Sequence, residues 1–520
     1  MNILIAAAEN NALNGAKVGG LGDVIGEIGP ELEKQDCRVT TVIPSYGFVH
    51  KINPSTHFTT FDFYFRGFDH HVDIFAVSAR NPDNTVHHLV IDHPAFGSPD
   101  SRTIYSHDPP DRPFATDASK FALFSTALAS ALVQNRLPFP DCVHLHDWHM
   151  AFFLILRKFH PYFHPLKTIR TVYTIHNLAM QGLRPFHGGE SALDSWFPGL
   201  WFDWMDLHDP GSKDCVNPMA AGIRLADRVH TVSPSYAEEI LKPSQKPDVY
   251  SGGEGLEHVL QYTHTQNRLK GILNGCTYPE NRPLPEKCFS ALCHTLKSGI
   301  SGWLAGKESL PVAHFLAHTR LSDPEVYNNP PSIVLTSVSR LTDQKMLLMK
   351  SNSSSGKSGL EEILYEVDRH NGLYILLGTG DWGYERFFSD MSALFDNFIF
   401  LNGYSEKCAD ALYINGDLFL MPSSFEPCGI GQMLAMRDGQ PAVVHHVGGL
   451  KDTVIHNHNG FVFTGNHLTE QVDNFIHTTK TALDMKKNRP DQWEKICRQA
   501  AGERFDWQKS AAEYINCLYQ

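Results

Sequence analysis

The sequence predicts an α/β protein built from two doubly wound, Rossmann-like parallel sheets. Short apolar runs rich in β-branched residues alternate with amphipathic stretches of helical length along most of the chain. The runs fall into two sets, separated by a less regular, Pro-rich stretch between residues 279 and 331. A chain of 520 residues is also too long for one ordinary domain. We therefore expect two domains, each folded around its own sheet.

Ten apolar runs have the length and composition of buried strands. The first set comprises residues 2–7, 38–43, 142–145, 171–174 and 229–232, and the second comprises 333–337, 374–377, 398–401, 418–421 and 442–444. A loop with polar or glycine residues and then a helical stretch follow each run. Ligands of doubly wound sheets bind at the carboxyl ends of the strands, so we expect the functional residues in these loops.

The same pattern predicts the domain boundaries. We expect an N-terminal domain at residues 1–268, a hinge near residues 268–276 and a C-terminal domain at residues 269–490. A last helix within residues 491–520 is expected to pack back on the N-terminal domain. The serine-rich segment 351–359 is typical of a flexible surface loop.

Charge and composition exclude several classes of protein. The formal net charge is −13, from 44 Lys and Arg against 57 Asp and Glu, and such an excess repels nucleic acid. No apolar stretch is long and unbroken enough to span a membrane, and the first residues predict a strand rather than a signal peptide. The ten cysteines show no paired spacing, so we expect reduced thiols in the cytoplasm.

A glycine-rich turn, Lys17-Val-Gly-Gly-Leu-Gly-Asp, follows the first expected strand and opens a helix. Gly19 and Gly20 allow the backbone to approach a ligand, and a helix start offers free N–H groups to a phosphate. Lys17 adds a positive charge at the same place. The alternative is a plain glycine turn with a solvated lysine. The segment lacks the G-x-x-x-x-G-K-[ST] pattern, which disfavours a P-loop ATPase.

A second segment, His144-Leu-His-Asp-Trp-His149, crowds three histidines at the end of an expected strand. The spacing matches no recognised zinc ligand set, and adjacent residues of a strand face opposite sides. The lining of an active site is the favoured interpretation. A zinc site and a purely structural role are the alternatives.

Two further segments follow strands of the second set. Ser339-Arg-Leu-Thr-Asp-Gln-Lys345 places Arg340 and Lys345 where they can converge on a diphosphate and neutralise the charge of a leaving nucleotide. The alternative is an exposed turn. In Ser424-Phe-Glu-Pro-Cys-Gly-Ile-Gly, the carboxylate of Glu426 precedes two glycines that permit close backbone contact with a ligand.

Several segments, in order along the chain, resemble motifs of the bacterial glycogen synthases and plant starch synthases. They are Lys17-Val-Gly-Gly-Leu-Gly-Asp, His146-Asp-Trp-His, Thr174-Ile-His-Asn-Leu-Ala-Met-Gln-Gly, Val232-Ser-Pro-Ser-Tyr-Ala-Glu-Glu-Ile, Ile272-Leu-Asn-Gly, Ser339-Arg-Leu-Thr-Asp-Gln-Lys, Phe425-Glu-Pro-Cys-Gly and Phe505-Asp-Trp-Gln-Lys-Ser-Ala. The resemblance covers nearly the whole chain. Each motif is weak alone, whereas their common order makes a chance match improbable.

The resemblance implies the glycosyltransferase B fold, in which two Rossmann-like domains face a cleft and the N-terminal domain takes the acceptor side. It implies a retaining glucosyltransferase that moves glucose from ADP-glucose to the non-reducing end of an α-1,4-glucan. It also implies that neither a metal ion nor another cofactor is needed, and the lack of an Asp-x-Asp motif agrees with this. The implied partners are the nucleotide-sugar donor and the glucan.

The resemblance also assigns residues to the nucleotide part of the donor. Lys17, Arg340 and Lys345 would hold the diphosphate. Tyr404, in Asn402-Gly-Tyr-Ser, would stack on the base. Four glycines would bring backbone amides near the phosphates: Gly19, Gly20, Gly429 and Gly431.

For the sugar, the resemblance assigns Glu426 and Cys428 to the glucose, together with Asn274. His149 would lie beside the anomeric carbon, and Asp117, in Thr116-Asp-Ala-Ser-Lys-Phe, would line the sugar site. The implied catalytic residues are Glu426, His149, Arg340 and Lys345.

The chain departs from the family pattern at four places: Val18 replaces Thr, and residues 276–279, 346–359 and 440–447 differ. These departures affect the prediction of which acceptor and which donor the protein uses. Two alternatives are therefore kept. One is a glucosyltransferase of the same fold that uses a small acceptor or UDP-glucose. The other is a weakly active, glucan-binding regulatory paralogue.

Overall fold

The computed structural model describes residues 1–97, 102–245, 252–278, 286–305, 310–324 and 328–520, which form two compact units. The first unit comprises residues 1–244, 252–277 and 506–520, and residues 278–505 lie in the second. The first unit thus runs past the predicted boundary at residue 268. The single helix expected after residue 491 is two helices: α20 (Pro490–Gly502) belongs to the second unit and α21 (Trp507–Tyr514) to the first.

The first unit is built on a nine-stranded sheet in the order β11-β10-β7-β6-β1-β2-β5-β4-β3. Its strands are β1 (Asn2–Ala6), β2 (Arg38–Pro44), β3 (Ser55–Phe65), β4 (Phe68–Val77), β5 (His87–Asp92), β6 (Cys142–His146), β7 (Arg170–Ile175), β10 (Arg228–Thr231) and β11 (Leu269–Gly271). All pairs are parallel except those that β4 makes with β3 and β5. The strand order reverses direction between β1 and β6.

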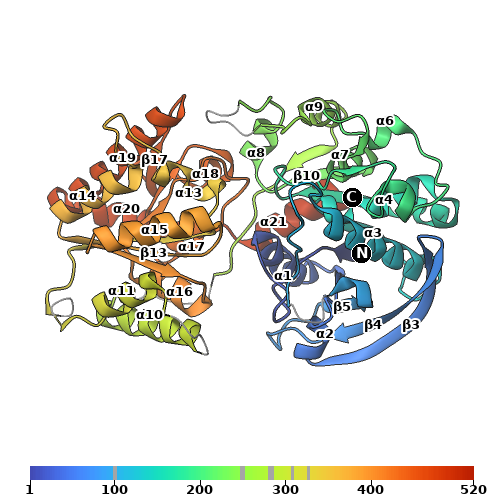
Figure 1. Ribbon diagram of the computed structural model, residues 1–520, viewed down its shortest axis with the longest axis horizontal. Helices are drawn as coiled ribbons and strands as arrows, with labels where there is room; N and C mark the ends of the chain where they lie inside the picture. The colour runs from blue at the N-terminus through green and yellow to red at the C-terminus, as the bar shows by residue number, and fades with distance from the viewer. Residues whose placement is uncertain (98–101, 246–251, 279–285, 306–309, 325–327) are drawn as a thin grey trace. The chain divides into compact units, whose positions relative to one another are not determined.

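Helices cover both faces of this sheet. Consecutive residues of β1 point to opposite faces of the sheet. Leu4 packs with α3 (Ala115–Val133), α4 (Ala151–Phe159) and α7 (Pro218–Leu225), whereas Ile3 packs with α1 (Gly20–Glu33) and α21. In Figure 1, α21 lies beside α1 although the two are far apart in sequence. Shorter elements complete the unit: α2 (Val49–Ile52), α5 (Leu193–Trp196), α6 (Trp204–Leu207), α8 (Pro234–Glu239), α9 (Glu257–Thr265), β8 (Arg184–Pro185) and β9 (Cys215–Val216).

The second unit contains a six-stranded, all-parallel sheet in the order β14-β13-β12-β15-β16-β17. Its strands are β12 (Ile333–Val338), β13 (Gly372–Gly378), β14 (Phe398–Asn402), β15 (Leu418–Met421), β16 (Ala442–His445) and β17 (Gly460–Phe463). Numbered by appearance, this is the order 3-2-1-4-5-6 of dinucleotide-binding folds. The order reverses between β12 and β15, which is the position where ligands of such sheets bind.

Two layers of helices sandwich the second sheet (Figure 1). One layer comprises α13 (Asp343–Lys350), α14 (Gly359–Arg369), α15 (Trp382–Leu394), α19 (Leu468–Asn488) and α20. The other comprises α10 (Phe289–Leu304), α11 (Val312–Arg320), α16 (Glu406–Asn415), α17 (Gly431–Arg437) and α18 (Gly448–Thr453). Consecutive strand residues such as Leu376 and Leu377 belong to opposite layers, as the period of a strand requires.

The predicted α/β class with two doubly wound sheets is confirmed, and each of the ten predicted strands overlaps an observed one. The long hairpin of β3 and β4 was not predicted. Its signal is nevertheless present, because Phe61, Phe63 and Phe65 are buried in alternation with exposed residues. Arg66 and Gly67, both with positive φ, form the turn.

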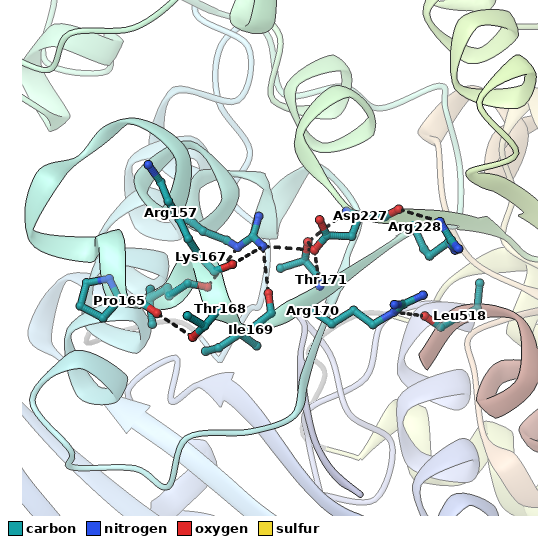
Figure 2. Close-up of polar contacts among 11 residues, drawn as sticks. Arg157, Pro165, Lys167, Thr168, Ile169, Arg170, Thr171, Asp227, Arg228 and Leu518 are labelled. Carbon is teal, nitrogen blue, oxygen red and sulfur yellow. Dashed lines mark hydrogen bonds and ion pairs between the residues drawn. The ribbon is translucent and has the colours of Figure 1, made fainter. Parts of the chain in front are cut away.

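A polar network joins the amino ends of β7 and β10, at the edge opposite the carboxyl ends of the strands (Figure 2). The Asp227 carboxylate accepts hydrogen bonds from the Thr171 amide at 2.8 Å and hydroxyl at 2.7 Å, and pairs with Arg157 at 3.2 Å. Arg170 Nε donates to the Leu518 carbonyl at 2.8 Å, which ties the end of the chain to β7. These contacts fix strand register and lie away from the predicted site.

Among the described residues, no helix combines the length and the apolar character needed to cross a membrane.

Candidate functional site

The glycine-rich turn at the start of α1 is shaped by a carboxylate that sequence reasoning missed. Glu9 is buried after β1 and accepts hydrogen bonds from the amides of Val18, at 2.6 Å, and Gly19, at 2.7 Å. The Tyr105 hydroxyl donates to the other Glu9 oxygen at 2.6 Å. A Cβ added to Gly22 would lie 3.1 Å from the Glu9 carboxylate. Two glycine-loop amides are therefore occupied by the protein itself. The sequence feature that could have indicated the role of Glu9 is an acidic residue between a predicted strand and a glycine-rich loop.

Lys17, Gly19 and Gly20 lie together at the start of α1. The Lys17 ammonium pairs with Asp23 at 2.6 Å, and Asn11 holds the same carboxylate at 2.7 Å. A Cβ added to Gly20 would meet no atom within 4 Å, so this part of the helix start borders open space. The turn thus presents a partly exposed cation beside an accessible backbone.

His149 is buried just past the carboxyl end of β6, in the short turn Trp148–Met150. Its ring packs edge-on against Phe121 at 4.5 Å and lies 5.5 Å from the Tyr105 ring, so Tyr105 links it to Glu9. The pKa of His149 is well below its usual value because the ring is desolvated and Lys120 is nearby. His149 is therefore neutral near pH 7. Its Nδ1 has no hydrogen-bond partner among the described residues, and the same holds for His146 Nε2.

The other histidines of this segment have protein partners. His144 Nδ1 lies 2.8 Å from the Tyr519 hydroxyl and its Nε2 lies 2.6 Å from the Thr174 hydroxyl, so the His144 ring ties the C-terminus to the sheet. His146 lies 2.9 Å from His176. Across the described ranges, no group of three His, Cys, Asp or Glu is arranged to hold a metal ion. His144 therefore has a structural role rather than lining a site.

Asp147, between these histidines, adopts a φ of 57° and accepts the His176 amide at 2.7 Å. Burial raises the pKa of Asp147 to about 7. A positive φ at a non-glycine residue carries strain that the surrounding contacts must offset. The hydrogen bond between the Asp147 carboxylate and the His176 amide, just after β7, holds the turn that carries His149.

Asp117 is locked in a buried ion pair on the first turn of α3. Its carboxylate lies 2.7 Å from the Lys120 ammonium, one turn further on, and accepts the Ser106 amide at 3.1 Å. Lys120 also donates to the Ile104 carbonyl at 2.5 Å. The pair joins residues 104–106 to α3, and the Lys120 charge acts on His149. Asn274, after β11, is buried, and its Oδ1 has no partner within the described part of the chain.

In the second unit, the loops after β12 and β15 meet where the strand order reverses. The Lys345 ammonium forms an ion pair with the Glu426 carboxylate, which also accepts the Ser423 hydroxyl at 3.0 Å. The Ser424 amide donates to the Gln344 carbonyl at 2.8 Å and holds the two loops together. Both Lys345 and Glu426 are largely buried, whereas Arg340 is exposed.

Each glycine in or against the Glu426 loop occupies its position for a different structural reason. Gly429 has a φ of +76°, and a Cβ there would lie 2.6 Å from Gln432 Oε1. Cys428 is buried because Gly449 packs on it: a Cβ at Gly449 would lie 2.5 Å from the Cys428 Cα. Gly431 is the first residue of α17. Backbone packing thus fixes the segment that carries Glu426.

Tyr404 follows β14 and exposes 52% of its surface. Its carbonyl accepts the Trp303 indole N–H at 3.1 Å. The predicted residues therefore divide between the two units. The first unit contains Lys17, Gly19, Gly20, Asp117, His149 and Asn274. The second contains Arg340, Lys345, Tyr404, Glu426, Cys428, Gly429 and Gly431.

A buried carboxyl on α1 gives a pH-dependent prediction. Burial, and then the Asp23 charge, raise the pKa of Glu27 from 4.5 to about 7, although Trp507 donates a hydrogen bond to it. The folded state then binds a proton more tightly than the unfolded state between pH 4.5 and 7, so the contribution of Glu27 to stability falls as pH rises through this window.

We expect Glu27→Gln to stabilise the protein at pH 8 by about 2 kcal/mol relative to wild type, and by much less at pH 5. Gln keeps an oxygen that accepts the Trp507 N–H. Urea unfolding of both proteins at each pH gives the difference. An equal difference at pH 5 and pH 8 would contradict a charged Glu27 in this environment.

Comparisons with known proteins agree over the whole chain. The starch synthase catalytic domain matches residues 2–262, and the glycosyl transferases group 1 family matches residues 363–492. The glycogen synthase of Streptococcus equi subsp. equi is 33% identical, over 100% of this chain and 99% of the relative. The glycogen synthase of Clostridioides difficile is 32% identical over 96% of both chains.

The structure of the catalytic domain of starch synthase IV from Arabidopsis thaliana, bound to ADP and acarbose, is also similar. It superposes with a TM-score of 0.75 at 26% identity and covers 99% of this chain and 98% of its own. This likeness and the two doubly wound sheets confirm the predicted glycosyltransferase B fold.

Proposed function

Since the chain belongs to the glycogen synthase and starch synthase family of glycosyltransferases, we propose that it transfers glucose from ADP-glucose to the non-reducing end of an α-1,4-glucan, with retention of configuration. The observation that carries this proposal is the Lys345–Glu426 pair, which lies where the second sheet reverses its strand order. A cation for the diphosphate and a carboxylate for the sugar are thus adjacent. The Arabidopsis relative was solved with ADP and acarbose bound.

In this proposal, Arg340 and Lys345 neutralise the diphosphate as the glycosidic bond of the donor breaks. Glu426 binds glucose hydroxyls and stabilises positive charge on the sugar ring, and Cys428 contacts the same sugar. Side chains that are positioned before the reaction lower the barrier because they need no reorganisation. The charge is supplied by side chains, so we expect activity to persist in the presence of EDTA.

His149 is proposed to lie beside the anomeric carbon, with Asn274 nearby. Burial keeps the imidazole neutral, so it does not repel the positive charge that develops on the sugar. Its Nδ1 and the Asn274 Oδ1 lack partners among the described residues, which leaves them available to sugar hydroxyls. Lys17 and the amides at Gly20, Gly429 and Gly431 complete the phosphate contacts.

We place the enzyme in the cytoplasm. All ten cysteines lie in the described residues and none forms a disulfide, which fits a reducing compartment. ADP-glucose and an α-glucan are the proposed partners.

The donor is tested by a matrix of substrates. With glycogen as acceptor, we expect a higher kcat/KM for ADP-glucose than for UDP-glucose. Initial rates of nucleotide release give both constants, and the same assay with maltose tests a small acceptor. A higher kcat/KM with UDP-glucose, or a preference for maltose over glycogen, would favour the alternative of a small-acceptor glucosyltransferase.

A further inference from the structure

Side chains of α10 and α11 contact the loop that carries Tyr404 and the end of the preceding strand. The indole N–H of Trp303, near the end of α10, donates to the Tyr404 carbonyl at 3.1 Å. The Trp303 side chain also reaches the preceding residue, because a Cβ added to Gly403 would lie 2.7–3.0 Å from three atoms of the indole. The indole therefore packs directly against the backbone of Gly403 and fixes the backbone of Tyr404 by a hydrogen bond.

His314 of α11 extends this support by one residue. It is 1% exposed, and its Nε2 lies 2.9 Å from the Asn402 carbonyl, so the Nε2–H tautomer donates there. The His314 and Trp303 rings are 5.7 Å apart. The carbonyls of Asn402, at the end of β14, and of Tyr404, in the following loop, are thus held by the neighbouring side chains His314 and Trp303.

A second support comes from α15. Glu385 accepts hydrogen bonds from the Asn402 side chain at 3.3 Å, the Thr379 hydroxyl at 2.5 Å and the Gly380 amide at 3.0 Å. Leu341, next to Arg340, pairs with Gly380. This support connects Asn402 to the loops after β12 and β13. Glu385 contacts Asn402, whereas Trp303 hydrogen-bonds to the backbone of Tyr404, the residue proposed to stack on the base.

We propose that Trp303 is a positioning residue for the nucleotide base of the donor, acting through Tyr404. The inference rests on the proposed role of Tyr404 in stacking. A ring on an unsupported loop loses conformational freedom when it stacks on a base, and that loss weakens binding. Trp303 restricts the loop before the nucleotide arrives. Trp303 thereby strengthens binding of the base, although it is not itself a residue of the predicted site.

The test uses Trp303→Ala and Trp303→Phe. Phe keeps an aromatic ring beside Gly403 and removes the N–H donor. We expect Trp303→Ala to weaken ADP binding about 10-fold and Trp303→Phe to lie between it and wild type. The KM for ADP-glucose should rise similarly while kcat changes little. Inhibition by inorganic pyrophosphate, which has no base, should not change. Thermal unfolding verifies that each variant is folded, and Phe315→Ala, at an exposed position of α11, is the matched control.

A double-mutant cycle separates this inference from the proposed function. If Trp303 acts through Tyr404, the double variant Trp303→Ala/Tyr404→Ala binds ADP as weakly as Tyr404→Ala alone. Additive losses, or an equal loss of pyrophosphate inhibition in Trp303→Ala, would overturn the positioning role and leave the stacking role intact. Normal ADP binding by Tyr404→Ala would overturn the stacking role and this inference with it.

Discussion

Replacing Lys345 or Arg340 with alanine should lower kcat by about 10²–10³-fold, the scale for the loss of one charge-stabilising contact. Negative charge moves onto the diphosphate as the donor breaks, so the contact is stronger in the transition state than in the bound donor. The protein carries a net charge of −13, and its overall field does not help. The KM for ADP-glucose should therefore change much less than kcat.

The two variants should differ in stability. Arg340 is exposed, whereas Lys345 forms a largely buried pair with Glu426. Loss of the Lys345 ammonium leaves a buried carboxylate without its partner, which destabilises the fold. We expect a lower melting temperature for Lys345→Ala alone. Lys350→Ala, at an exposed lysine of the same helix, is the control for both readouts. If Arg340→Ala and Lys345→Ala both raise KM at unchanged kcat, these two cations only bind the substrate and do not stabilise the transition state.

Glu426→Gln is expected to lower turnover by at least about 10²-fold with the fold intact. Gln preserves the shape and accepts the Ser423 hydroxyl, but it removes the charge that faces Lys345 and the proposed sugar. Single-turnover kinetics with ADP-glucose and glycogen measure the chemical step. Glu494→Gln, at an exposed position of α20, is the matched control. Near-normal turnover by Glu426→Gln would rule out its assignment as a catalytic residue.

The sheets were predictable because parallel strands that are buried on both faces have continuous apolar sequences. Leu373 to Leu377 and Phe398 to Leu401 are examples, and all lie in the core. The polar loops after such runs, at Arg340 and Glu426, could likewise be placed at one edge of a sheet. The Asp117–Lys120 pair was also within reach, because residues three apart share a helix face.

Contacts between distant residues could not be predicted in this way. His144 and His149 look alike in the sequence, yet His144 binds Tyr519 while His149 keeps an unpartnered nitrogen among the described residues. Glu9 acquires its role only when the chain returns to place Val18 and Gly19 beside it. Likewise, nothing in the local pattern around Trp303 indicates that its indole meets the backbone of Gly403 and Tyr404.

In the proposed reaction, this chain extends an α-glucan with glucose from ADP-glucose. The test measures ADP release, and the transfer of radiolabelled glucose from ADP-glucose, in the presence and absence of glycogen. We predict that ADP is released only when glycogen is present, and that the label enters chains that an α-1,4-specific exo-hydrolase degrades. Binding of glycogen without ADP release would contradict the claim and favour a regulatory paralogue.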